Sequence, residues 1–152
     1  MNVRCLVDTN VLVYAVDPRS GAKSITANEI LEGLASRRDA VTTAQVVSEF
    51  YSAVTRPREG SPLLQPAGAI AWLGDWIFLT VFIDLTLAIA EEAIRAAHLH
   101  RMNIYDAQMW AAAKIHAIPV LITEDLQSRP QIEGVRYVNP FAPSFAPAPI
   151  GL

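Results

Sequence analysis

Four acidic residues stand in stretches that are otherwise apolar, where a carboxylate is costly unless a positive group pairs with it. The four stretches are CLVDTNVLVYAVD with Asp8, QVVSEFYSAV with Glu49, NIYDAQMWAAA with Asp106 and VLITEDL with Asp125. No lysine or arginine lies within three residues of Asp8 or Asp106. The pattern therefore predicts that folding gathers these acids around a hard divalent cation, which is the chemistry of a metal-dependent enzyme.

The bulk composition limits the number of domains and the kind of partner. A chain of 152 residues fits one domain. Hydrophobic residues make up 52% and the mean hydropathy is +0.27, which suits a large core or some apolar interface. The net charge of -3 and the pI near 5.5 exclude a strongly basic nucleic-acid binder. Any contact with nucleic acid must therefore come from a local basic patch and from a metal.

The same composition indicates a cytoplasmic protein that does not enter a membrane. The single cysteine, Cys5, cannot form a disulfide within the chain, which suits a reducing compartment. No signal peptide is expected, because Asp8 comes before an apolar segment can develop. The most apolar stretch, residues 61–83, is interrupted by prolines and by Asp75, so no membrane span is predicted.

Short apolar runs alternate with helical patterns, which predicts an α/β fold with a mainly parallel sheet. Strands are expected at residues 3–7, 39–41, 77–83, 119–122 and 135–138. Helices are expected at residues 10–16, 22–37, 67–76 and 86–101, with two more that begin at Thr42 and Asn103. Thr42 with Gln45 matches a capping box. One domain is predicted at residues 1–139, followed by a proline-rich tail at 140–152 that we expect to be extended or mobile.

Two of the acids are expected at the carboxyl ends of strands, where ligands bind in open parallel sheets. Asp8 follows the first strand, and Glu124 and Asp125 follow the strand at residues 119–122. Asp8 is also a good helix cap, and Asp106 stands at the third position after its own capping residue, so a purely structural role stays open for both. If the acids do converge, oxygen-only ligands favour Mg²⁺ or Mn²⁺ over zinc.

Glu49 lies on a helix face with other polar residues. Gln45, Ser52 and Arg56 share that face at helical spacing, so a solvated surface is the alternative to a functional role. Arg56 could pair with Glu49 or bind a phosphate group. At the second strand end, the Thr123 hydroxyl could orient a ligand carboxylate.

Other catalytic patterns are missing from the sequence. His98 and His100 do not share a helix face, and His116 stands alone, so zinc-ligand spacing is absent. There is no glycine-rich phosphate loop and no Gly-x-Ser-x-Gly motif. A haloacid-dehalogenase-type phosphatase needs a second aspartate where Asn10 stands, and the paired acid of a receiver domain is also missing.

With these residues in place, the chain resembles the PIN-domain ribonucleases, and more closely the VapC toxins of bacterial toxin–antitoxin modules. The matching segments are LVDTNVLVYAVD, QVVSEFYSAVTRP, IYDAQMWAAA, LITEDLQ and VNPF, in the order of the family. The resemblance implies a compact αβα sandwich, dependence on Mg²⁺ or Mn²⁺, and cleavage of single-stranded or looped RNA. It also implies homodimers and a cognate antitoxin that blocks the active-site groove.

The resemblance also assigns roles to residues. The four family acids correspond to Asp8, Glu49, Asp106 and Asp125. Glu124 is the alternative for the fourth place, and Thr9 and Asn10 match the residues that follow the first acid and orient it. Asp8 and Asp106 are expected as direct metal ligands.

The remaining roles concern the second metal site and the RNA. Glu49 and Asp125 are expected to bind a second ion, or to hold water and act as base. Arg56 is a candidate phosphate contact, and Tyr105 or Tyr51 a candidate for stacking on a base. Three alternatives stay open: a PIN fold that binds without catalysis, a metal-dependent DNA nuclease or phosphatase, and a plain α/β interaction protein.

Overall fold

A mainly parallel sheet runs through the middle of the protein, whose structure is a computed structural model that describes residues 2–125 and 129–151. The strands are β1 (Cys5–Val7), β2 (Ala40–Thr43), β3 (Val81–Ile83), β4 (Val120–Ile122), β5 (Gln131–Ile132) and β6 (Val135–Val138). Their order is β3-β2-β1-β4-β6-β5, and only the β5–β6 pair is antiparallel. The expected mainly parallel α/β sheet is therefore confirmed.

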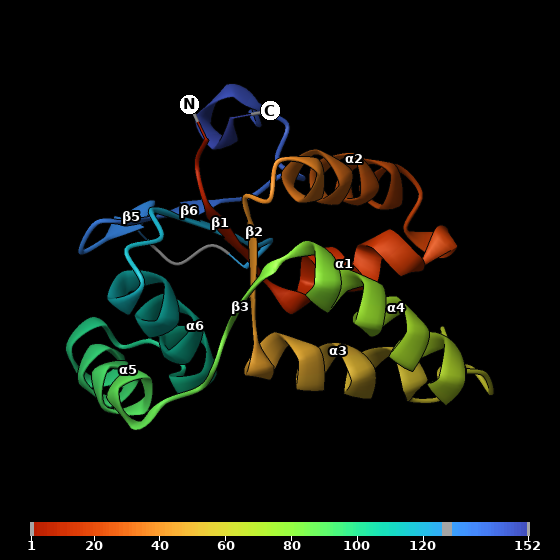
Figure 1. Cartoon of the computed structure of the whole chain (residues 1–152), viewed down its shortest axis with the longest axis horizontal. Helices are drawn as coiled ribbons and strands as arrows, with labels where there is room; N and C mark the ends of the chain where they lie inside the picture. Colours follow the sequence, from red (N-terminus) through yellow and green to blue (C-terminus); the bar gives the residue numbers. More distant parts are fainter. Residues whose placement is uncertain (1, 126–128, 152) are drawn as a thin grey trace.

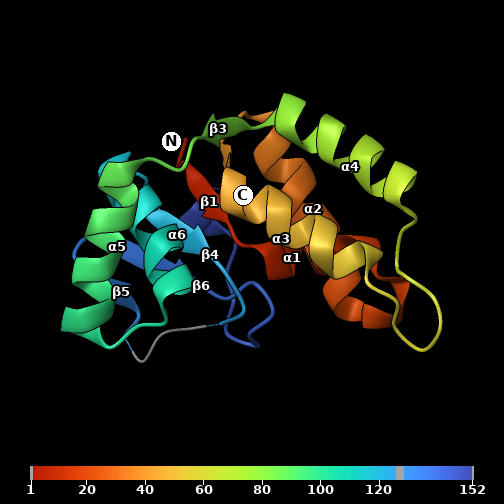
Figure 2. The same cartoon turned by 90° about the horizontal axis from the view of Figure 1, so that it is seen from below.

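Helices cover both faces of this sheet. They are α1 (Thr9–Val16), η1 (Pro18–Ser20), α2 (Ala22–Ser36), α3 (Ala44–Thr55), α4 (Pro66–Leu79), α5 (Leu87–His100), α6 (Ile104–Ile115) and η2 (Ala148–Ile150). Helix α2 lies on one face, and α3, α5 and α6 lie on the other (Figure 1 and Figure 2). Helix α5 packs on α6, and α4 packs on α3. The layers form the αβα sandwich that the resemblance implied.

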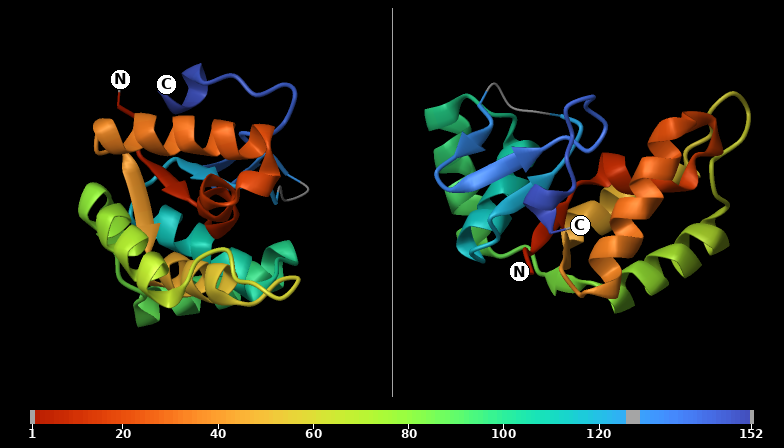
Figure 3. Two further views of the ribbon diagram at one scale, coloured as in Figure 1. Left: turned by 90° about the vertical axis from the view of Figure 1, so that its right-hand side faces the viewer. Right: turned by 90° about the horizontal axis from the view of Figure 1, so that it is seen from above.

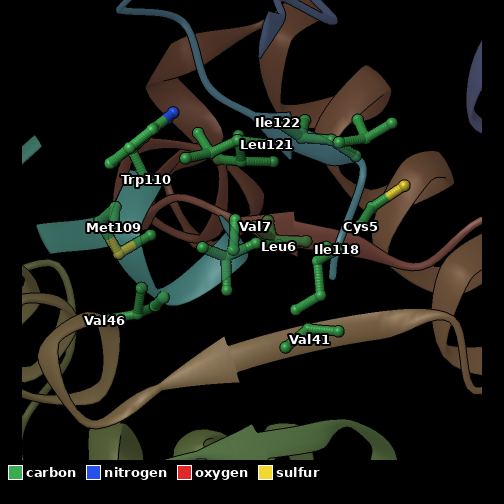
Figure 4. Packing of buried hydrophobic residues seen from close by; sticks show 14 of the residues in the cluster. Cys5, Leu6, Val7, Val41, Val46, Met109, Trp110, Ile118, Leu121 and Ile122 are labelled. Carbon is green, nitrogen blue, oxygen red and sulfur yellow. The ribbon is translucent and has the colours of Figure 1, made fainter. Parts of the chain in front are cut away.

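The central strands form where the sequence has short runs of apolar residues without a polar alternation. All three residues of β1 and all three of β4 are buried, as expected for parallel strands with helices on both faces. Met109 and Trp110 of α6 pack beside Leu6, Val7 and Leu121 of these strands (Figure 4). This buried centre fixes the positions of the residues that leave the carboxyl ends of β1 and β4.

The start of α3 differs by one residue from the prediction. A capping box with Thr42 was expected, but Thr42 is the third residue of β2 and is buried in the sheet. Thr43 ends the strand, and its side chain accepts a hydrogen bond from the backbone N–H of Val46 at 3.2 Å. Thr86 and Asn103 cap α5 and α6 as predicted.

The predicted strand at residues 77–83 is wrong over its first half. Helix α4 continues to Leu79, and only Val81–Ile83 form β3, at the edge of the sheet. An uninterrupted apolar run suits a helix or a strand equally well, so periodicity alone cannot place the boundary. The two-residue strand β5 was not predicted.

The carboxyl-terminal segment, predicted to be an extended or mobile tail, contains side chains that pack on the domain. Phe141 and Phe145 contact the core, and Ile150, the last residue of the short helix η2, is fully buried. The two ends of the chain lie next to each other (Figure 1 and Figure 3). The domain boundary at residue 139 stays a prediction. Within the described residues, no helix is long and apolar enough to cross a membrane.

Candidate active site

The four acids that the sequence singled out line one open pocket at the carboxyl edge of the sheet. Asp8 follows β1 and Asp125 follows β4, and these two strands are parallel neighbours, so their ends meet. Glu49 reaches the pocket from the middle of α3, and Asp106 from the first turn of α6. The pocket has a volume of about 380 Å³. The structure therefore brings the four acids together in one pocket, as the sequence predicted.

Asp8 is the most confined of the four acids. One carboxylate oxygen accepts the backbone N–H of Thr9 at 2.6 Å, and the other accepts the Thr123 hydroxyl at 2.7 Å. Burial raises the pKa of Asp8 to about 6, and the negative charges of Glu49 and Asp106 act in the same direction, against the two hydrogen bonds. A buried carboxylate beside like charges is a place that favours a cation.

Thr9, Asn10 and Thr123, expected to orient the acids, hold them in one network. The Asn10 side-chain amide donates to the Thr123 hydroxyl oxygen at 3.1 Å and to Asp125 at 3.3 Å. The same hydroxyl oxygen accepts the backbone N–H of Asp125 at 3.0 Å. Thr9 donates its hydroxyl to Glu49 at 3.0 Å, which ties α1 to α3. All three side chains therefore contact the acids, and their role in orienting metal ligands stays a prediction.

Two glutamines, Gln45 on α3 and Gln108 on α6, also hold Glu49 in position. Gln45 donates its side-chain amide to the second oxygen of Glu49 at 2.8 Å and to the backbone carbonyl of Tyr105 at 3.1 Å. Gln108 in turn donates to the side-chain oxygen of Gln45 at 2.7 Å. Gln108 was missed because its helix looked apolar nearly all round. The pair fixes Glu49 relative to the first turn of α6, where Asp106 lies.

Glu124, the alternative for the fourth acid, is placed elsewhere. It forms an ion pair with Lys23 and accepts the hydroxyl of Tyr14. Although burial opposes the change, these two hydrogen bonds hold the pKa of Glu124 below its ordinary value. Glu124 already has a cationic partner, whereas its neighbour Asp125 lines the pocket.

The arginine at the pocket is not the one that the sequence suggested. Arg56 is exposed and contacts Ser52 at 3.5 Å, whereas Arg58 lines the pocket. A two-residue turn positions Arg58, because its backbone N–H and C=O both bond Ser61, at 2.8 and 3.0 Å. Glu59 and Gly60 between them have positive φ angles of 52° and 90°, the conformation of tight hairpin turns.

Comparison with known proteins identifies the family. The family model described as the PIN domain matches residues 5–129, which include all four acids. The chain belongs to the PIN-domain family. No curated protein matches the sequence closely enough to be considered a relative.

Solved structures of PIN-domain toxins have the same fold. A toxin–antitoxin complex from Klebsiella pneumoniae is 20% identical with a TM-score of 0.65, and covers 90% of this chain and 98% of its own. VapBC2 from Rickettsia felis, bound to a DNA fragment from its promoter, is 15% identical with a TM-score of 0.67, over 90% and 98%. VapC20 from Mycobacterium tuberculosis, a toxin that cleaves the sarcin–ricin loop, is 18% identical with a TM-score of 0.59, over 77% and 86%.

The donor set of this PIN-domain pocket fits a hard divalent cation. Apart from Arg58, the polar side chains that line the pocket are aspartate, glutamate, asparagine, threonine and tyrosine, and carboxylate, amide and hydroxyl oxygens are the ligand chemistry of Mg²⁺ and Mn²⁺. Among the described residues, no lysine, arginine or histidine forms an ion pair with Asp8, Glu49 or Asp125. Among residues 2–125 and 129–151, no three acids, histidines or cysteines are arranged so that they could hold a metal ion as they stand.

One buried residue next to the acids escaped the sequence analysis altogether. Tyr137 of β6 shares a small second cavity with Asp8, Asp106 and Asp125. Burial, followed by the charges of Asp106 and Asp8, raises the pKa of Tyr137 well above its ordinary value. The only signal in the sequence was its alternation with Arg136 on a short strand, which places Tyr137 on an inner face but not beside the acids.

Proposed function

We propose that this PIN-domain protein is an endoribonuclease that depends on Mg²⁺ or Mn²⁺. The observation that carries the proposal is the lining of one open pocket by four carboxylates and a single guanidinium, counted among the described residues. Such a pocket repels a phosphodiester unless a cation is present, because its formal charge is strongly negative. With a cation present, the same pocket can receive a phosphate group and a water molecule together.

The four acids have two different roles in the proposed reaction. Asp8 and Asp106 are the first choice for direct ligands, while Glu49 and Asp125 hold a second ion or a water molecule. A bound divalent cation lowers the pKa of a coordinated water and stabilises charge on the phosphate oxygens. Glu49 or Asp125 accepts the proton of the attacking water, so no side chain has to act as nucleophile. Thr9, with its hydrogen bond to Glu49, keeps that acid directed at the pocket.

Substrate contacts come from the rim of the pocket. Arg58 takes the role of phosphate contact that the sequence had suggested for Arg56, because Arg58 faces the acids. Tyr105 is largely exposed on the first turn of α6, one residue before Asp106, where it can stack on an unpaired base. The net charge of -3 provides no general attraction for RNA, so recognition depends on shape and on few contacts.

We further propose that the chain is the toxin of a VapBC-type module, with a cognate antitoxin as protein partner and a homodimer as its assembly. The similar solved structures include toxin–antitoxin complexes, which supports an antitoxin. Exposed apolar side chains support a protein interface. Phe78 at the end of α4 is 76% exposed and Leu87 at the start of α5 is 74% exposed.

The experiment compares three substrates in one assay. Purified protein is incubated with RNA, single-stranded DNA and a phosphomonoester, each with Mg²⁺, Mn²⁺ or EDTA. We expect cleavage of RNA alone, lost in EDTA, with kcat reduced at least about 1,000-fold in Asp8→Asn. Asp75→Asn, which changes an exposed acid on α4, is the matched control and should cleave like wild type.

Each alternative function predicts a different outcome. Cleavage of DNA or of the phosphomonoester without cleavage of RNA would show that the proposed substrate class is wrong. Undiminished RNA cleavage by Asp8→Asn would remove Asp8 from the catalytic site. A wild-type protein that binds no Mn²⁺ and cleaves nothing would be a PIN-fold binding module. Mapping the RNA ends produced by controlled expression of wild type and Asp8→Asn then locates the cellular target.

A further inference from the structure

A small chamber lies beside the open pocket and shares Asp8, Asp106 and Asp125 with it. Three of the four acids line it together with Thr123 and Tyr137, and Met109 and Leu121 supply its apolar walls. Its volume is about 10 Å³, which is close to the space that one water molecule needs. A water in such a space also needs polar partners, and this chamber has carboxylates, a hydroxyl of threonine and a hydroxyl of tyrosine on its walls.

The Tyr137 hydroxyl is buried without a hydrogen-bond partner among the described residues. Tyr137 is only 6% exposed, and its ring is fixed because β6 pairs with β4 and its backbone N–H donates to Pro130 at 2.9 Å. A buried hydroxyl that bonds nothing destabilises a protein, so native structures satisfy nearly all such groups with protein or ordered water. The chamber is where a partner for this hydroxyl can stand.

The hydrogen-bond capacities of the wall groups match one water molecule. A tyrosine hydroxyl donates one proton, and each carboxylate has about four acceptor positions. Asp8 accepts three hydrogen bonds, from Thr9, Thr123 and, at 3.4 Å, the side-chain amide of Asn10, and so keeps about one of its four acceptor positions. A water that accepts from Tyr137 and donates to Asp8 and Asp106 makes three hydrogen bonds, the usual number for a buried water.

We propose that Tyr137 is a positioning residue, which holds one buried water that bridges the carboxylates of Asp8 and Asp106. The inference rests on the proposed function, since it adds a residue to that metal-binding site. By donating to both carboxylates, the water keeps their inner oxygens apart from each other and turns their outer oxygens toward the pocket. The Tyr137 hydroxyl thereby sets the separation of the two expected metal ligands without touching the metal or the RNA.

The test removes the hydroxyl while keeping the ring. Tyr137→Phe is compared with wild type and with Thr80→Val, a matched control that removes another buried hydroxyl without a partner among the described residues, at the end of α4 and outside the lining of either cavity beside the acids. Mn²⁺ affinity is measured by calorimetry on protein without RNA. We expect Tyr137→Phe to bind Mn²⁺ about 10-fold more weakly or worse, as for lost groups that orient metal ligands. Its kcat should fall while KM for RNA stays within twofold, and Thr80→Val should match wild type in Mn²⁺ affinity, kcat and KM.

Two further measurements keep the inference independent of the enzyme activity. In EDTA, Tyr137→Phe should melt at a lower temperature than wild type, because it loses the bridged hydrogen bond. An equal or higher melting temperature would mean that the hydroxyl bonds nothing and would overturn the inference. A crystal structure of wild type that resolves ordered water should show one molecule in the chamber, and a dry chamber would also overturn it. A wild type that binds no Mn²⁺ would instead refute the proposed function, while these two measurements still decide the role of Tyr137.

Discussion

Asp8→Asn should stabilise the cation-free protein while it abolishes RNA cleavage. Burial raises the pKa of Asp8 from 3.8 to about 6, with Glu49 and Asp106 adding to the shift. The folded state therefore holds the Asp8 proton more tightly than the unfolded chain does. An ionised Asp8 at neutral pH lowers the free energy of unfolding, and an asparagine in its place carries no such charge.

The size and sign of the effect follow from the pKa. Each pKa unit corresponds to about 1.4 kcal/mol, so the raised pKa of Asp8 lowers the free energy of unfolding at neutral pH by about 3 kcal/mol. Since the folded state binds more protons between pH 3.8 and about 6, stability falls as the pH rises through that interval and is level above it. Asparagine has one oxygen for the two donors Thr9 and Thr123, which costs about 1 kcal/mol. The net gain is then about 2 kcal/mol at pH 7, or about 4–8 °C in Tm.

The assay is thermal unfolding in EDTA at several pH values between 4 and 8, for wild type, Asp8→Asn and the exposed control Asp75→Asn. The variant should exceed wild type at pH 7 and lose most of that advantage at pH 4, which lies close to the ordinary pKa of 3.8, below which Asp8 is mainly protonated in both states. Added Mn²⁺ should raise the Tm of wild type and leave Asp8→Asn unchanged.

Two results would refute this account of the buried charge. One is an Asp8→Asn variant that is less stable than wild type at pH 7 in EDTA. The other is a stability difference that stays the same at pH 4 and pH 8, since a charge effect must vanish where Asp8 is neutral. Either result would mean that Asp8 contributes to the fold mainly as a helix cap.

Three further predictions follow from other contacts. Arg58→Gln should raise KM for RNA about 10-fold or more through the loss of a charged hydrogen bond, whereas Arg56→Gln should leave KM unchanged in the same steady-state assay. Thr123→Val, which keeps the side-chain shape but removes the hydroxyl bound to Asp8, should weaken Mn²⁺ binding about 10-fold in calorimetry, and unaltered affinity would contradict the orienting role. Glu133→Gln should lower stability by about 1 kcal/mol at pH 7 without affecting cleavage, because hydrogen bonds from Lys114 and His100 lower the pKa of Glu133 from 4.5 to about 2. In denaturant titrations, that loss should shrink as the pH falls from 4.5 toward 2.

The positions of the acids at strand ends were predictable from the sequence because they depend on a short pattern and a general rule. An apolar run followed by an acid marks the end of a buried strand, and parallel strands bring such ends together. Asp8 and Asp125 satisfy this rule directly. Choosing Asp125 over Glu124 needed the fold, because only the packing of α1 and α2 places Lys23 beside Glu124.

The choice of arginine depended on a turn that the sequence analysis assigned only to a loop. Helical spacing placed Arg56 on the face of Glu49, but α3 ends at Thr55 and the chain then leaves the helical path. The turn at Glu59 and Gly60 reverses the chain and brings Arg58 to the pocket. The arginine at the pocket is therefore Arg58, two residues beyond the predicted Arg56, which stays on the exposed surface.

Long-range packing explains the features that local patterns could not predict. Residues 77–79 continue a helix because α4 can pack on α3, although the apolar run suits a strand as well. Phe141 and Phe145 find partners in the core although the segment around them has no periodicity. Tyr137 faces the acids only because β6 lies beside β4, a neighbour relation that no local pattern encodes.

Asp8 shows why a structural and a functional role could not be separated from the sequence. The residue is a helix cap, since it accepts the backbone N–H of Thr9 at the start of α1. A cap needs only one carboxylate oxygen, and the other is held across the sheet by Thr123. A solvated cap at a helix amino terminus is expected to have a lowered pKa, because the helix dipole favours its negative charge. The raised pKa of Asp8 therefore means that burial beside like charges outweighs the cap, and a positive charge placed beside Asp8 would offset both effects.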